Sequence, residues 1–186
     1  MNKILIIEGI ATSGKSSLIK ELIAQLGDDK IHVYSESDTH IPIRKASDEL
    51  HIDFFKALLQ DAFKSEKELV VFDRLYLTAA FRAEASIEQY EEIEELLHRH
   101  NALTAYLKVD EDAVEERINL SIEKPRVALA SEHDGESWVD HIKTRGQSFK
   151  EIAEYYIVQQ QTQIQSLKQS KLESRIFNTT DHEYKN

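Results

Sequence analysis

A phosphate-binding pattern stands near the start of the chain. The apolar residues 3–8, KILIIE, lead directly into GIATSGKS at residues 9–16, which fits the pattern G-x-x-x-x-G-K-S. Its glycines allow a tight turn that brings backbone N–H groups onto phosphate oxygens. Lys15 can place its ammonium on the β- and γ-phosphates, and the hydroxyl of Ser16 can ligate Mg²⁺. A helical pattern follows at residues 16–26, so the positive end of that helix faces the same anion.

A chance match in an ordinary strand, loop and helix is the alternative. The three elements follow in the order that the motif requires, which favours a nucleotide site. The expected contacts are Gly9, Ala11, Thr12, Ser13, Gly14, Lys15, Ser16 and Ser17.

A second polar group follows the apolar residues 69–72, LVVF. Parallel strands open at one edge of a sheet, so Asp73 should emerge near Ser16 and help to hold Mg²⁺. The alternative is an Asp that only begins the next helix. Arg74 stands where motor-type ATPases usually carry a water-activating Glu, and it would point a second cation at the site. This suits an acceptor that is itself anionic or must be fixed against the γ-phosphate; the alternative is a surface ion pair.

The composition of the chain limits the number of its domains and the classes of molecule that it is expected to bind. Its 186 residues, with no cysteine and a net charge of -11, indicate one globular domain. A strongly acidic protein disfavours nucleic acid as a partner, although a local group of Lys and Arg can still bind a small anion. Without cysteine there is no disulfide and no thiolate chemistry. No apolar stretch approaches the roughly 20 residues of a membrane span, so we expect no membrane association and a cytoplasmic protein.

Apolar runs alternate with helical stretches, which predicts an α/β fold with a mostly parallel sheet. The polar, poorly periodic residues 123–136 interrupt this pattern and indicate either a mobile flap or a surface loop. The expected strands are 4–8, 31–34, 69–72, 103–107 and 175–177. The expected helices are 16–26, 45–64, 75–85, 87–100, 112–122 and 138–172, with Gly146 as a candidate break in the last.

Together these motifs resemble the thymidylate kinase and deoxynucleoside kinase group of P-loop kinases. The resemblance is carried by IIEGIATSGKS, by FDRL at residues 72–75, by YLKVDEDAVEERI at residues 106–118, and by IFNTTD at residues 176–181. It implies a three-layer P-loop NTPase fold with a five-stranded parallel sheet, a mobile lid at about 123–136 and an acceptor-side helical segment at about 37–64. It also implies ATP and Mg²⁺ as cofactors. Members often dimerise, so a homodimer is among the implied assemblies.

The resemblance also implies roles for single residues on the phosphate side. Arg117 matches an Arg that approaches the transferring phosphates. The group often carries a further Arg four residues later, where this chain has Ser121. Lys124, Arg126 or Arg145 could replace it, and the sequence does not choose among them.

On the acceptor side, Glu36 aligns with a Glu of both families and could take a proton from the acceptor hydroxyl or orient it. An acceptor that is already a phosphate needs no base. The alternative interpretation of Glu36 is an ordinary loop residue. Arg44 is a candidate anchor for the acceptor. Asn178 and Thr179 lie where adenine contacts are often found.

The sequence therefore predicts transfer of the γ-phosphoryl group of ATP to a small acceptor, foremost a nucleoside or nucleoside monophosphate. The residues around Glu36 match neither family, so an antibiotic or a metabolite stays open as the acceptor. A nucleotide-dependent ATPase or switch is a further alternative. Neither the acceptor nor the choice of ATP over GTP follows from the sequence.

Overall fold

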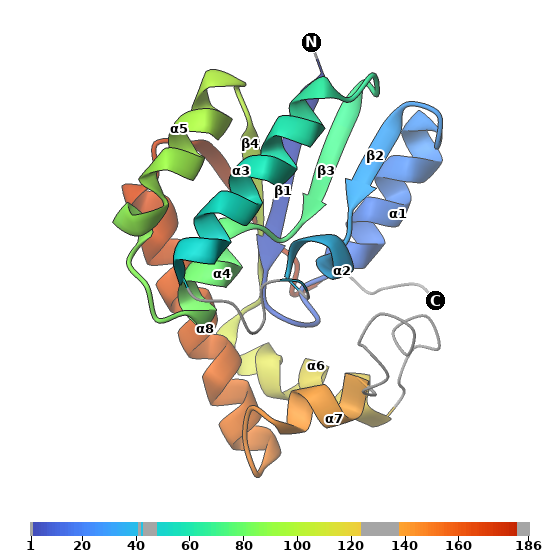
Figure 1. Cartoon of the computed structure of the whole chain (residues 1–186). Helices are drawn as coiled ribbons and strands as arrows, with labels where there is room; N and C mark the ends of the chain where they lie inside the picture. Colours follow the sequence, from blue (N-terminus) through green and yellow to red (C-terminus); the bar gives the residue numbers. More distant parts are fainter. Residues whose placement is uncertain (1, 41, 43–47, 124–137, 182–186) are drawn as a thin grey trace.

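Five parallel strands form the centre of the molecule, in the order β2-β3-β1-β4-β5. The computed structural model describes residues 2–40, 42, 48–123 and 138–181 (Figure 1). The predicted α/β fold with a five-stranded parallel sheet is confirmed. The strands are β1 (Lys3–Gly9), β2 (Ile31–Tyr34), β3 (Leu69–Asp73), β4 (Leu103–Lys108) and β5 (Glu173–Asn178).

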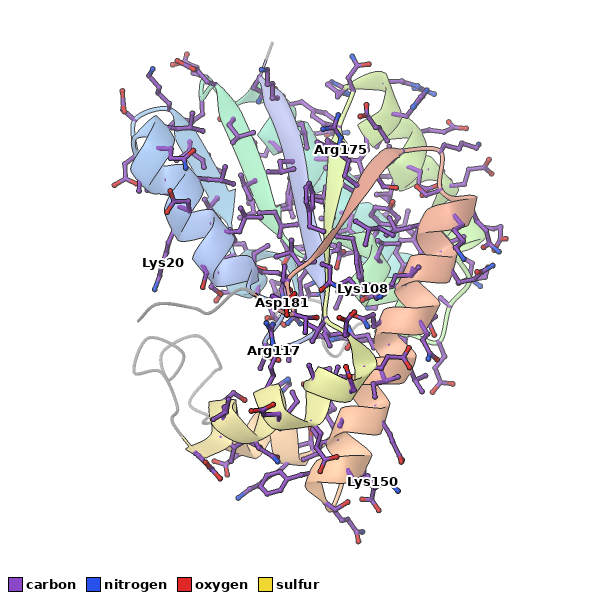
Figure 2. All side chains as sticks on the ribbon, turned by 180° about the vertical axis from the view of Figure 1, so that it is seen from behind. Lys20, Lys108, Arg117, Lys150, Arg175 and Asp181 are labelled. Atoms are coloured by element: carbon purple, nitrogen blue, oxygen red, sulfur yellow. The ribbon has the colours of Figure 1, made fainter. Side chains whose placement is uncertain are left out.

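Alternation along the strands separates two hydrophobic layers, because successive side chains point to opposite faces of a sheet. Ile4 and Ile6 of β1 face a core built with α3 (Asp48–Lys64), α4 (Tyr76–Arg82) and α5 (Glu91–Arg99). Ile7 faces the opposite core, which α1 (Lys15–Leu26) covers. Figure 1 shows α3, α4 and α5 on the near side of the sheet. Figure 2, which views the molecule from behind, shows α1 on the opposite side of the sheet. The result is the expected three-layer arrangement.

Beyond the carboxyl ends of the strands lies a third hydrophobic cluster, which includes Ile10, Val109 and Ile118. It is built with α6 (Glu111–Glu123), α7 (Trp138–Lys143) and the first half of α8 (Phe149–Gln169) (Figure 1). Helix α8 continues along the sheet, where Leu167 joins the main core. These elements bring α6 and α8 against the edge at which parallel sheets bind ligands.

Two of the predicted helical regions are divided in the structure. In the region 138–172, the expected break near Gly146 separates α7 from α8, and Ser148 begins α8 with a capping box. The region 87–100 opens with a 3-10 helix, η1 (Ile87–Tyr90), before α5. The expected lid, beyond Glu123 of α6, lies outside the described residues. None of the described helices is both long and apolar enough to cross a membrane.

A short helix, α2 (Glu36–Thr39), lies at the start of the expected acceptor-side segment but was not among the individual helices predicted. Ser35 begins it, and both its backbone N–H and its hydroxyl donate to Asp38 Oδ2, at 2.8 and 2.7 Å. This capping arrangement stabilises a single turn. Glu36 therefore stands on the first turn of a helix rather than in a loop.

Candidate functional site

The phosphate-binding loop joins β1 to α1. Thr12 and Gly14 have positive φ angles of 63° and 99°, a geometry in which successive N–H groups can line an anion-binding concavity. Gly9 has a φ of 144°, and a Cβ there would lie 2.6 Å from the carbonyl oxygen of Leu107. Only glycine fits this position without displacing the backbone of β4. The loop thus has the backbone form that the sequence motif predicts.

Lys15 lies in this loop with only 6% of its surface exposed. Its ammonium donates to the carbonyl oxygens of Gly9 and Ile10, at 3.1 and 2.8 Å. Burial and then the charge of Arg74 lower the pKa of Lys15 to about 7, although nearby carboxylates oppose the change. Phosphate oxygens at the loop would favour the charged form of this amine.

Asp73 ends β3 directly beside β1, in register with Ile7. Its Oδ1 is buried and has no hydrogen-bond partner among the described residues. Burial raises the pKa of Asp73, and the charges of Lys15 and Arg74 oppose that change. An orphaned carboxylate oxygen at this edge is suited to a cation.

Mg²⁺ commonly binds one or two protein groups and completes its shell with phosphate oxygens and waters. The part of the chain that the structure describes holds no group of three or more His, Asp or Glu side chains arranged for a metal. Asp73, with the exposed Ser16 of the first turn of α1, is the pair that could hold Mg²⁺ together with a bound nucleotide.

Glu36 is clamped between two arginines. Its Oε1 accepts from Arg74 Nη1 at 3.1 Å and from Arg82 Nη2 at 2.9 Å. The side chains of Glu36 and Arg74 are 16% and 7% exposed. Burial raises the pKa of Glu36, but the charges of Arg74 and Arg82 outweigh it and hold that pKa well below its usual value. The carboxylate is therefore ionised at neutral pH.

His40 lies four residues after Glu36, at the end of the same helical turn. It is 3% exposed, its Nε2 has no hydrogen-bond partner among the described residues, and its ring meets that of Phe55 edge to face. Burial, and then the charge of Arg82, keep its pKa well below the usual value, so the imidazole is neutral. It adds a polar but uncharged group beside Glu36.

Arg145, from the turn between α7 and α8, approaches this cluster from another direction. Its guanidinium lies 5.0 Å from the ring centroid of Tyr155. Burial raises the pKa of the neighbouring Tyr156 to about 12, although the charges of Arg74, Arg145 and Arg82 act to lower it.

Arg117 of α6 connects the phosphate-binding loop to the end of β5. Its guanidinium donates to the carbonyl oxygens of Thr12 at 3.1 Å and Thr180 at 2.8 Å, and also to that of Thr179. The Thr179 hydroxyl donates to the carbonyl of Ser13 at 3.0 Å. Figure 2 shows Arg117 between α6 and the segment that ends at Asp181.

The structure thus brings together most of the predicted site residues at one edge of the sheet. Asn178 donates to Asp110 at 2.9 Å and accepts from the N–H of Thr180, so its amide is used in shaping the turn after β5. Arg44, Lys124 and Arg126 lie outside the described residues.

Sequence reasoning missed three residues of the site. Arg82 reaches Glu36 only through the packing of α4, for which the sequence holds no local signal. His40 follows Glu36 by four residues at the end of α2, and it was missed because that helix was not predicted. Glu8 is fully buried and bonds the start of α4. The alternation of β1 places it on the face of Ile4 and Ile6, and this could have indicated an inward-facing carboxylate.

Comparison with known proteins gives structural matches only. No family model matches the chain, and no curated protein matches it. The YorR protein of Bacillus subtilis, solved with phosphorylated GDP, is 17% identical, with 95% of this chain and 86% of that chain covered and a TM-score of 0.61. Polyphosphate kinase 2 of Arthrobacter aurescens is 14% identical, with 95% and 60% covered and a TM-score of 0.58. Thymidylate kinase of Candida albicans is 16% identical, with 98% and 85% covered and a TM-score of 0.52.

At these identities the likeness concerns the fold. The chain shares its fold with these proteins, two of which are kinases, and this confirms the fold expected from its motifs.

Proposed function

We propose that the chain transfers the γ-phosphoryl group of ATP to a small acceptor of the nucleoside or nucleoside monophosphate class. The observation that carries this proposal is the clamped, ionised Glu36 beside the cations Arg74 and Arg82, at the edge that also holds the phosphate-binding loop. A carboxylate that is held and ionised in this way can accept a hydrogen bond from an acceptor hydroxyl and orient it for proton transfer. The kinase fold supports the same reading.

The donor side of the proposal rests on charge and position. Phosphoryl transfer has a loose transition state, so positioning and neutralisation of phosphate charge dominate its catalysis. Lys15 and the N–H groups of the loop would hold the phosphates, while Arg74 would face the transferring group. Mg²⁺, held by Ser16 and Asp73 with the nucleotide, would neutralise charge on the β- and γ-phosphate oxygens.

On the acceptor side, both arginines donate to Oε1 of Glu36, so we assign Oε2 to the acceptor hydroxyl. The acceptor oxygen forms a bond to the γ-phosphorus while the bond from that phosphorus to the β-bridging oxygen breaks. The hydroxyl proton passes to Glu36, and ADP leaves with the bridging oxygen. Arg74 and Arg82 keep the carboxylate in place until the proton moves.

Local charge fits this chemistry although the protein as a whole is acidic, with a net charge of -11. Among the described site residues, the arginines Arg74, Arg82, Arg117 and Arg145 outnumber the carboxylates Glu8, Glu36 and Asp73. A cluster of this sign attracts a polyphosphate even on an anionic protein.

A nucleoside monophosphate is the second candidate acceptor. The observation that favours it is a further cation, Arg145, which lies over the ring of Tyr155. The charge of Arg145 also lowers the pKa of Arg82. An acceptor with its own phosphate would bring a negative charge to these two arginines, and its phosphate would need no base.

The experiment is ADP formation with Mg²⁺ and a panel of nucleosides, nucleoside monophosphates and other hydroxylated metabolites, with a no-acceptor control. We expect strong stimulation by one nucleoside or nucleotide. ATP consumption that no acceptor stimulates would contradict the proposal and indicate an ATPase or switch. Stimulation only by another metabolite would contradict the proposed acceptor class and would identify a kinase of a different small molecule.

A variant separates the two acceptor types. Because general-base catalysis contributes about 10²–10⁴-fold, we expect Glu36→Gln to lower kcat by at least about 10²-fold with a nucleoside acceptor. Glu91→Gln is the matched control, since Glu91 is exposed on α5 and pairs only with Lys171 among its described contacts. An unchanged kcat in Glu36→Gln would rule out the base and favour the monophosphate.

A further inference from the structure

A fully buried glutamate ends the apolar run of β1. Glu8 is 0% exposed and lies one residue before the phosphate-binding loop. The alternation of the strand turns it toward the same layer as Ile4 and Ile6, where α4 packs. A carboxylate in such a layer is costly unless its oxygens are hydrogen-bonded.

The carboxylate of Glu8 binds the beginning of α4. Its Oε1 accepts from the backbone N–H of Leu75 at 2.8 Å and of Thr78 at 3.4 Å, and its Oε2 accepts from the Thr78 hydroxyl at 2.6 Å. The first N–H groups of a helix have no partner within the helix. Leu75 occupies the N-cap position and its side chain cannot cap the helix. Glu8, far away in sequence, supplies the missing acceptor.

Each of these contacts requires Glu8 to accept. The Thr78 hydroxyl itself accepts from Gln163 Nε2 at 3.0 Å, and Gln163 Oε1 accepts from the Tyr106 hydroxyl at 2.9 Å. The hydroxyl proton of Thr78 is therefore directed at Glu8. Burial raises the pKa of Glu8, and the hydrogen bonds from Thr78 and Leu75 oppose that change.

The segment between β3 and α4 is anchored to β1 at two successive residues. The N–H of Arg74 donates to the carbonyl of Ile7 at 3.0 Å, and Glu8 holds the next N–H, that of Leu75. Arg74 has a φ of 67°, a left-handed conformation that non-glycine residues rarely adopt without support. The anchors on β1 hold this turn in a conformation that it would not favour alone.

We propose that Glu8 is a positioning residue, whose carboxylate fixes the turn at Asp73 and Arg74 relative to the phosphate-binding loop. One end of β1 thereby sets both halves of the site, since the loop begins at Gly9. Arg74 in turn holds Glu36. The predicted effect of Glu8 on kcat rests on the proposed function. Its predicted effect on the stability of the turn at residues 74–78 does not.

The test compares Glu8→Gln with Glu94→Gln. Glu94 is another buried glutamate, 4% exposed, and it accepts from the Tyr76 hydroxyl at 3.0 Å, so it contacts a side chain of α4 and not the backbone N–H groups at the start of that helix. A glutamine at position 8 must present an NH₂ group either to the Thr78 hydroxyl or to the N–H groups of Leu75 and Thr78, all of which donate to Glu8. We expect hydrogen exchange of the amides of residues 74–78 to accelerate in Glu8→Gln and not in Glu94→Gln.

Kinetics give the second readout. Misplacement of a catalytic group by about 1 Å can cost about 10²-fold, so Glu8→Gln should lower kcat by about 10- to 100-fold. Affinity for a non-hydrolysable ATP analogue should stay within about two-fold, because the loop itself is unchanged. Equal losses of kcat in both variants, or no loss in Glu8→Gln, would overturn the proposal.

A second pair of variants covers the case in which Glu8→Gln does not fold. Thr78→Val removes the hydroxyl bonded to Glu8, and Thr104→Val removes a buried hydroxyl without a hydrogen-bond partner in the described chain. We expect faster exchange at residues 74–78 and a lower kcat only in Thr78→Val. If the wild-type protein shows no acceptor-dependent turnover, the proposed function fails while the exchange data still decide the role of Glu8. Unaltered exchange in Thr78→Val would contradict it.

Discussion

At the scale of single residues, burial sets the chemistry of Lys15. The pKa of about 7 results from burial and the nearby charge of Arg74, so a large fraction of this amine is neutral in the free protein at neutral pH and above. Bound phosphate oxygens stabilise the ammonium and raise that pKa again. Nucleotide binding and protonation of Lys15 are therefore linked.

This linkage gives a pH prediction. At about pH 8.5, well above the pKa of about 7 in the free protein, binding of MgATP should take up roughly one proton, because only the charged amine pairs well with phosphate. Calorimetric titrations in buffers of different ionisation enthalpy measure this proton. Lys15→Arg is the control, since its guanidinium stays charged at this pH. A binding enthalpy that does not depend on the buffer would contradict the prediction.

At the scale of elements, Arg117 connects segments of the structure through hydrogen bonds to backbone carbonyl oxygens. It links α6 to the carbonyl oxygens of Thr12 and of Thr180, and so ties the phosphate-binding loop to the turn after β5. The sequence resemblance implied an approach of this residue to the transferring phosphates. The observed contacts support a role in shaping the loop that binds them.

The Arg117→Ala variant tests this connection. Hydrogen bonds that involve a charged group contribute about 1.5–3 kcal/mol, so we expect the Kd for ATP to rise by about 10-fold or more, with a smaller change in kcat. Arg175→Ala is the matched control, because Arg175 is exposed on β5 and pairs with Glu173 (Figure 2). A Kd for ATP that stays within about two-fold in Arg117→Ala would show that the connection does not matter for binding.

The elements also show what the sequence could predict. The strands followed from short apolar runs, and the phosphate-binding loop followed from its residue types, since both signals are local. Helix α2 was missed because a single turn has no periodicity, although Ser35 and Asp38 form a capping pair. The clamp on Glu36 could not be predicted, because Arg82 reaches it across 46 residues through the packing of α4.

At the scale of the whole molecule, one edge of the sheet carries the site. The phosphate-binding loop after β1, the Asp73-Arg74 turn after β3 and the segment after β5 meet there because the strands are parallel. Helix α6 closes this edge from the other side through Arg117 (Figure 2). The net charge of -11 gives this edge no general attraction for anions, so binding of ATP depends on the local cations.

The most direct test of the account follows the label of γ-labelled ATP into the acceptor that the panel identifies, in the wild-type protein and in Lys15→Ala. Circular dichroism of both proteins controls for folding. Loss of one preorganised electrostatic contact costs about 10²–10³-fold, so the account predicts labelled acceptor with the wild type and at least about 10²-fold slower labelling with Lys15→Ala. Labelling at a near-normal rate in a folded Lys15→Ala protein, or label found only in inorganic phosphate with the wild type, would contradict it.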